Sequence, residues 1–173
     1  MAKIKKFTLT PATENDIRAL AALHNAVAAQ LTAQYGIGPW SAATSEKWVG
    51  YALRISQIFV ARLGPEIVGT FRLTTRKPWA IDTTFFTPVK KPLYLLAMAV
   101  TPDHQRRGLG TRCLKAALEI AQTWPADAIR LDAFDAPAGA GRFYSKSGWT
   151  ATGRATYRRA KLIYYEYSLK PLL

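Results

Sequence analysis

The chain has 173 residues, of which 49% are hydrophobic and 20% are charged. This length and composition exclude a disordered chain and predict a single domain with its own core over residues 1–173. The 24 lysines and arginines outnumber the 11 acidic residues, which gives a formal net charge of +13. A positive surface attracts polyanions, so nucleic acid and a phosphate-rich cofactor both stay open as partners on charge alone.

Cysteine and histidine are scarce, with one Cys and two His. A lone thiol excludes an internal disulfide, and so few soft ligands argue against any metal site. The longest apolar run, residues 93–100, is too short to span a bilayer, and no apolar segment follows the basic N-terminus. These features favour a cytoplasmic protein with no membrane partner.

The first third of the chain predicts a strand followed by two helices. Residues 4–10 suit a short strand, and Thr13 then suits an N-cap for a helix with apolar positions at helical spacing over residues 17–31. Glycines and a proline in residues 36–39 end that helix. Ser41 is predicted to cap a second helix that runs to about residue 55.

The middle of the chain predicts a hairpin and a long loop. Two β-rich stretches, 57–63 and 67–74, flank a Gly-Pro turn, which is typical of antiparallel strands. Residues 77–92 contain three prolines among aromatic residues, so they predict a long loop anchored by those aromatics. The apolar run 93–100 predicts a central strand that is buried on both faces.

The last third of the chain alternates between helices and strands. A glycine loop over residues 105–110 leads into a helix that stops at a Trp-Pro pair. Residues 128–133 predict a strand, and a short helix over residues 139–147 follows it. A final hairpin is expected from residues 149–157 and 162–169.

The glycine loop stands where a buried strand passes into a helix. Gly108 and Gly110 lack a Cβ, so the backbone can turn tightly there, and the free N–H groups of the first helical turn favour an anion. The dinucleotide fingerprint G-x-G-x-x-G fails because Cys113 occupies its last position, and the G-x-x-x-x-G-K-[ST] loop is absent from the chain. A pyrophosphate would fit this loop, but neither of those two nucleotide-binding motifs describes it.

Two segments carry a family resemblance. The first holds Val at 100, Pro at 102, Gln at 105 and Gly at 108 and 110, which meets every fixed position of V-x-P-x-x-[QR]-x-x-G-x-[GA], and so resembles the GNAT superfamily of N-acetyltransferases. Residues 140–149 look like that family's A-x-x-[FL]-Y-x-[KR]-x-G-[FW] stretch. The resemblance implies an α+β fold whose mixed, mostly antiparallel sheet has about seven strands, flanked by about four helices. It also implies that strands 93–100 and 128–133 diverge to admit a cofactor.

The resemblance further implies that acetyl-CoA is the co-substrate and that no metal is needed. Main-chain groups of Met98 and Val100 would pair with the pantetheine arm, and a backbone N–H near Met98 would stabilise the oxyanion. The pyrophosphate would be held by the signature loop and the first helical turn, which comprise Gln105, Arg106, Arg107, Gly108, Leu109, Gly110 and Thr111.

Tyr144 corresponds to the family's general acid, which protonates the thiolate that leaves when an amine attacks the thioester. A phenol has a pKa near ~10 and a thiol near ~8.5, so this donation is chemically reasonable. The chain departs from the family at Pro137, where many members have an asparagine seven residues before the tyrosine. That cofactor contact is then absent or replaced.

The general base is unassigned. Many relatives carry a carboxylate on the strand before the glycine loop, but residues 94–100 contain none. Asp132 and Asp135, at and just after the end of the next predicted strand, are the nearest candidates, and Glu46 and Asp82 are more remote ones. An acceptor amine of modest pKa would need no base.

Several other reactive side chains have a structural explanation. Cys113 is next to the apolar stripe of a predicted helix and is interpreted as a small packing residue rather than a nucleophile. His24 shares a helical stripe with leucines and is interpreted as a hydrogen-bonded packing histidine. Packing is also the main expectation for the loop aromatics, with acceptor binding as the alternative; these are Trp40, Trp79, Phe85 and Phe86.

The sequence thus predicts an N-acetyltransferase that transfers an acetyl group from acetyl-CoA to a primary amine of a small molecule or a protein N-terminus, by direct attack in a ternary complex. Two other classes stay open: a non-catalytic acyl-CoA sensor and a basic nucleic-acid-associated protein. The positive charge weakly favours anionic amines, amino acids or protein N-termini over cationic acceptors. No motif identifies the acceptor or decides whether the chain forms a homodimer.

Overall fold

The computed structural model of the chain describes residues 6–169. The chain folds into two compact units, which are described separately below. Unit 1 contains the chain up to Arg72 together with Ala97–Ala116, and unit 2 contains Leu73–Leu96 together with the chain from Ala117 onward. None of the helices within residues 6–169 has the length and apolar character needed to cross a membrane.

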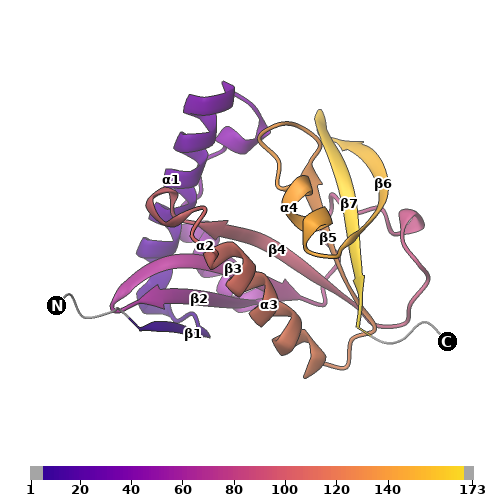
Figure 1. The fold of residues 1–173 in the computed structure, drawn as a ribbon, viewed down its shortest axis with the longest axis horizontal. Helices are drawn as coiled ribbons and strands as arrows, with labels where there is room; N and C mark the ends of the chain where they lie inside the picture. Colours follow the sequence, from indigo (N-terminus) through magenta and orange to yellow (C-terminus); the bar gives the residue numbers. More distant parts are fainter. Residues whose placement is uncertain (1–5, 170–173) are drawn as a thin grey trace. The chain divides into compact units, whose positions relative to one another are not determined.

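The described residues form seven strands, paired in the order β1-β2-β3-β4-β5-β7-β6, and four α-helices (Figure 1). The strands are β1 Phe7–Pro11, β2 Gln57–Leu63, β3 Glu66–Thr74, β4 Pro92–Val100, β5 Ala128–Phe134, β6 Thr150–Tyr157 and β7 Ala160–Ser168. The helices are α1 Ile17–Tyr35, α2 Glu46–Ile55, α3 Leu109–Gln122 and α4 Gly141–Lys146. This mixed, mostly antiparallel sheet with its helices confirms the predicted α+β fold, although the first residues of the expected strand 4–10 lie outside the described part.

In unit 1 the N-terminal helices α1 and α2 pack against each other, and α2 packs on strand β2 (Figure 1). Strand β1 pairs with β2 in antiparallel register, with Phe7 opposite Leu63. One apolar cluster joins α1 and α2 to the sheet; it contains Leu20, Ala21, Val49, Ala52, Ile58 and Val60. Burial of these side chains, at roughly 25 cal/mol per Å² of apolar area, stabilises the helices far more than their intrinsic propensity does.

Neither predicted cap is directly at the start of its α-helix: Thr13 caps a 3-10 turn, Glu14–Asp16, that leads into α1, whose own N-cap position is Asp16. The backbone N–H of Thr13 donates to Asp16 Oδ2 at 2.9 Å, which is one half of a capping box, and Arg62 fixes the same carboxylate at 2.6 Å. The prediction that Ser41 caps α2 is wrong, because Ser41 ends a separate 3-10 turn, where its Oγ accepts from Gly38 N. Ser45 is the cap, since its Oγ accepts from Trp48 N at 3.1 Å.

Strand β4 is only partly buried, which corrects the prediction for residues 93–100. Leu93, Tyr94 and Leu95 are buried, but the strand becomes partly exposed from Leu96 onward. Its parallel pairing with β5 covers the three positions from Pro92 to Tyr94. Ala97 then adopts a left-handed backbone with φ of 50°, which is strained for a residue with a Cβ. Hydrophobicity alone could not reveal that the pairing of this strand with β5 ends after Tyr94.

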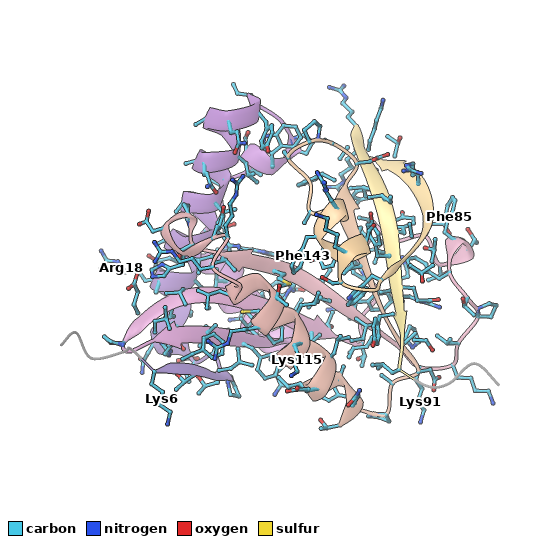
Figure 2. All side chains as sticks on the ribbon, in the orientation of Figure 1. Lys6, Arg18, Phe85, Lys91, Lys115 and Phe143 are labelled. Atoms are coloured by element: carbon cyan, nitrogen blue, oxygen red, sulfur yellow. The ribbon has the colours of Figure 1, made fainter. Side chains whose placement is uncertain are left out.

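Unit 2 is built on the antiparallel strands β5, β7 and β6, with α4 beside them (Figure 1). The loop before β4 is anchored as predicted, but only by some of its aromatics. Phe86 is buried. The ring of Phe85, which is labelled in Figure 2, packs on Gly153 of β6, where a Cβ would lie 2.2 Å from it. Trp79, in contrast, is 88% exposed.

Cys113 of α3 is buried against Gly69 of β3, within unit 1. Burial raises the pKa of its thiol to about 11, so the nucleophilic thiolate is rare at pH 8. We expect iodoacetamide to alkylate Cys113 at least about a hundredfold more slowly in the native protein than in guanidinium chloride. Mass spectrometry of quenched time points measures both rates. Native alkylation within tenfold of the unfolded rate would contradict the packing role.

Candidate functional site

The loop between β4 and α3 is fixed to unit 1 at its start. Thr101 N donates to Val68 O of β3 at 2.9 Å, and Thr101 Oγ1 lies 3.0 Å from His104 Nδ1. A short 3-10 turn, Pro102–His104, then leads to Gln105. The start of the glycine segment is therefore held in place by hydrogen bonds to the end of the sheet.

The side-chain amide of Gln105 forms its hydrogen bonds within the protein. Its Nε2 donates to Gln30 Oε1 of α1 at 2.9 Å, and Gln30 Nε2 donates back to Gln105 Oε1 at 3.1 Å. The same Nε2 also lies 3.1 Å from Val100 O. The side chain of this signature residue joins α1, the end of β4 and the loop, and any contact with coenzyme A would have to come from its backbone.

The glycine segment turns through two left-handed residues before α3 begins. Arg106 has φ of 58° and Gly108 has φ of 77°. No atom lies within 4 Å of a Cβ built on Gly108, so the glycine is required for its backbone conformation and not for space. Leu109, Gly110 and Thr111 then open the helix, where N–H groups have no acceptor one turn earlier. This arrangement suits a phosphate group.

The side chains of Arg106 and Arg107 are exposed at that turn, and Met98 and Val100 are partly buried at the end of β4. Unit 1 thus brings together the whole set of predicted cofactor residues, from the strand end to the first helical turn. The donors come mainly from the backbone, and two arginines flank them. Such a site is compatible with the pyrophosphate of coenzyme A.

Tyr144 lies in unit 2, on α4, and is 7% exposed. Its ring packs against Phe143, Trp149 and Tyr165, with centroid distances of 5.3, 5.7 and 5.8 Å. Burial and then the nearby carboxylate of Asp132 raise the pKa of the phenol well above its usual range. The hydroxyl therefore keeps its proton at neutral pH, which is the state a general acid needs.

The two candidate bases occupy different surroundings. The negative charge of Asp132, on β5, contributes to the raised pKa of Tyr144. Burial raises the pKa of the Asp132 carboxyl as well. Asp135, beyond the end of β5, forms an ion pair with Arg154 at 3.0 Å, in which the side chains are 36% and 68% exposed. Within unit 2, Asp132 therefore interacts electrostatically with Tyr144, whereas Asp135 is paired with Arg154.

A model of the acetyltransferase (GNAT) family matches residues 20–149, which is most of the chain. The chain belongs to the GNAT acetyltransferase family. The matched range includes the loop 105–111 and Tyr144, so the resemblance predicted from the two motifs is confirmed at the level of the family.

Solved structures agree with that assignment in fold. The GNAT chain is 23% identical to a GCN5-related N-acetyltransferase from Rhodopseudomonas palustris, with a TM-score of 0.71 over 98% of this chain and 99% of that one. It is 15% identical to yncA from Salmonella typhimurium, solved with its cofactor acetyl-CoA, with a TM-score of 0.69 over 97% and 96% of the two chains. The ribosomal-protein-S18-alanine N-acetyltransferase from Escherichia coli is also 15% identical, with a TM-score of 0.72 over 96% of each chain. A search of the curated proteins finds no match.

The GNAT chain also has a pocket in unit 1 that the motifs do not predict. Its lining comes from α1, the loop before α2, α2 and strands β2, β3 and β4, and comprises Leu20, His24, Thr44, Trp48, Val49, Ala52, Ile58, Thr70, Arg72 and Ala97. His24 was expected to be a hydrogen-bonded packing residue, but within residues 6–169 it has no hydrogen bond and faces this pocket. The positive charge of Arg72 helps to lower the pKa of His24. The one sequence feature that could have predicted the pocket is the presence of polar residues among apolar ones, namely His24 on α1 and Thr70 and Arg72 on β3.

Proposed function

We propose that this GNAT protein is an N-acetyltransferase that moves the acetyl group of acetyl-CoA to a primary amine of a small molecule or a protein N-terminus, with residues 1–173 acting as one domain. The loop 105–111 carries the proposal, because its left-handed turn and the open N-terminus of α3 form a backbone anion site directly after β4. The net charge of +13 adds long-range attraction for a cofactor rich in phosphate.

In the proposed reaction the amine attacks the thioester carbon within a ternary complex. A C–N bond forms and the C–S bond breaks, so no acyl-enzyme is needed. The amine loses one proton and the departing sulfur gains one. Backbone N–H groups near Met98 would hold the carbonyl oxygen, where the left-handed turn at Ala97 interrupts regular strand geometry.

Tyr144 is proposed as the acid that protonates the departing thiolate. Its raised pKa keeps the proton available, and a thiolate formed in equally apolar surroundings also binds protons more strongly than in water. Asp132 is the better of the two carboxylate candidates for the base that accepts the proton lost by the amine. Its charge contributes to the raised pKa of Tyr144, whereas Asp135 is paired with Arg154.

A thermal-shift titration tests the cofactor. At one hundred times its dissociation constant, acetyl-CoA should add about 2.7 kcal/mol to the free energy of unfolding and raise the midpoint by a few degrees, whereas NAD and ATP should not. A matched Gly108→Val variant should lose the shift, because a β-branched residue disfavours φ of 77°. No shift with the native protein would overturn the proposal and bring the nucleic-acid alternative forward.

Release of free thiol then tests the reaction. Incubation with acetyl-CoA and a panel of primary amines should release coenzyme A with at least one of them, as measured by a thiol reagent. A protein that shows the acetyl-CoA shift but no release with any amine, and no acetylated peptide N-terminus, would be an acyl-CoA sensor and not an enzyme.

A further inference from the structure

The pocket of unit 1 has a chemical character that narrows the acceptor. Two helices, the loop before α2 and the sheet line an open pocket of about 80 Å³, large enough for several water molecules or a small organic group. Leu20, Val49, Ala52 and Ile58 form apolar walls at its base, and Trp48 is half exposed. Polar groups enter from His24, Thr44, Thr70 and Arg72. This combination is typical of small-molecule sites.

The one permanently charged group in the pocket lining is the guanidinium of Arg72. Within residues 6–169 no carboxylate forms a salt bridge with it, and its single hydrogen bond, from Nη1 to Ser56 Oγ, is long at 3.5 Å. Burial lowers the pKa of Arg72, which is the signature of a cation partly removed from water. A guanidinium so placed costs free energy unless an anion pairs with it.

His24, which lines the same pocket as Arg72, does not add to its positive charge. Burial, and then the positive charge of Arg72, lower the pKa of His24 below its usual value. His24 is therefore neutral at pH 7 and adds no second positive charge. The lining also contains no acidic residue, so a cationic acceptor such as a polyamine would meet only the charge of Arg72.

We propose that this pocket binds the carboxylate of the acceptor through Arg72, and that the acceptor is a free amino acid with an apolar side chain. The inference rests on the proposed function for the amine half of the molecule. The guanidinium offers two parallel donors that match a carboxylate, and the apolar walls suit the side chain. Ala97 lines the same pocket and directly precedes Met98, so a bound amino acid would lie beside the strand segment where acetyl transfer is proposed.

The test compares each apolar L-amino acid with its own C-terminal amide, which keeps the amine and the side chain but removes the negative charge. For the native enzyme, kcat/KM for thiol release should be at least about tenfold higher for the acid than for the amide, the factor expected of a charge-assisted hydrogen bond. In Arg72→Gln that preference should fall to within about threefold, and Arg72→Lys should restore part of it.

Arg54→Gln is the matched control, because Arg54 is an exposed arginine on α2 that lies over Tyr51 and does not line the pocket. It should keep the full preference for the acid. Thermal midpoints of all variants show whether folding is intact. A native enzyme that uses amides as well as acids, or an Arg72→Gln variant that keeps the preference, would overturn the proposal.

Direct binding separates this inference from the proposed function. Calorimetric titration of the free amino acids into protein loaded with coenzyme A should show binding that Arg72→Gln loses by at least about tenfold. If acetyl transfer fails but this binding is found, the carboxylate site stands and the proposed function falls. If no free amino acid either binds or reacts, the carboxylate site itself is refuted.

Discussion

Replacing Tyr144 with phenylalanine should lower kcat for acetyl transfer by about a hundredfold to ten-thousandfold, the range that general-acid catalysis contributes. The change removes one hydroxyl from a ring that is already packed by Phe143 and Trp149, so the rest of the site should be preserved. The acetyl-CoA thermal shift should stay within a degree of the native value. Steady-state thiol release, measured with saturating acceptor, gives the ratio of the two kcat values.

Tyr165→Phe is the matched control for that experiment. Tyr165 lies in the same aromatic cluster, with its ring 5.8 Å from that of Tyr144, and its hydroxyl accepts a hydrogen bond from Ser145 Oγ at 3.3 Å. It should lose little kcat. Equal losses in the two variants would assign the effect to packing, and an active Tyr144→Phe enzyme would remove Tyr144 from the mechanism.

The second large effect is expected in stability, at the buried ion pair of unit 2. Arg130 and Glu166 lie opposite each other on β5 and β7, are 3% and 9% exposed, and join through a 2.8 Å bond from Nε to Oε2. Glu166→Leu should reduce the free energy of unfolding by about 3–5 kcal/mol, because it leaves the guanidinium buried without its carboxylate. The thermal midpoint should fall by roughly 6–20 °C.

The double variant Arg130→Met/Glu166→Leu decides whether the loss comes from an unpaired charge. It should recover most of the stability, since buried ion pairs are often replaced by apolar pairs at little cost. Asp135→Asn is the control, because its exposed pair with Arg154 should contribute no more than about 1 kcal/mol. Urea titrations measure all three, and equal losses for Glu166→Leu and Asp135→Asn would contradict the role assigned to burial.

Much of the fold was predictable because its elements carry local signals. The Gly-Pro turn predicted the β2–β3 hairpin, and Gly64 in that turn has a positive φ of 63°. The signature loop was predictable for a similar reason, since glycine at residue 108 is needed wherever a chain turns through the left-handed region. Signals of this kind depend on residues that are neighbours in sequence.

The features that were missed depend on residues distant in sequence. Ser41 and Ser45 are both competent caps, and only tertiary contacts place the first in its own turn beside Thr32, at 2.6 Å between hydroxyl oxygens. The pocket joins His24 to Arg72, which are neighbours only after α1 has packed on the sheet. The roles of Tyr144 and the loop 105–111 stay predictions that the experiments above decide.

The hydrogen-bonded pair of Gln30 and Gln105 attaches the loop proposed to bind the cofactor to α1 without any formal charge. Neither amide gains or loses a proton in ordinary buffers, and ions do not screen a bond between neutral groups as they screen a salt bridge. A carboxylate in an ion pair at this place would repel the phosphates that the loop is proposed to bind. A bond between two neutral groups adds no charge that would oppose the proposed anion, and this one attachment of the loop to α1 is insensitive to acidity and ionic strength.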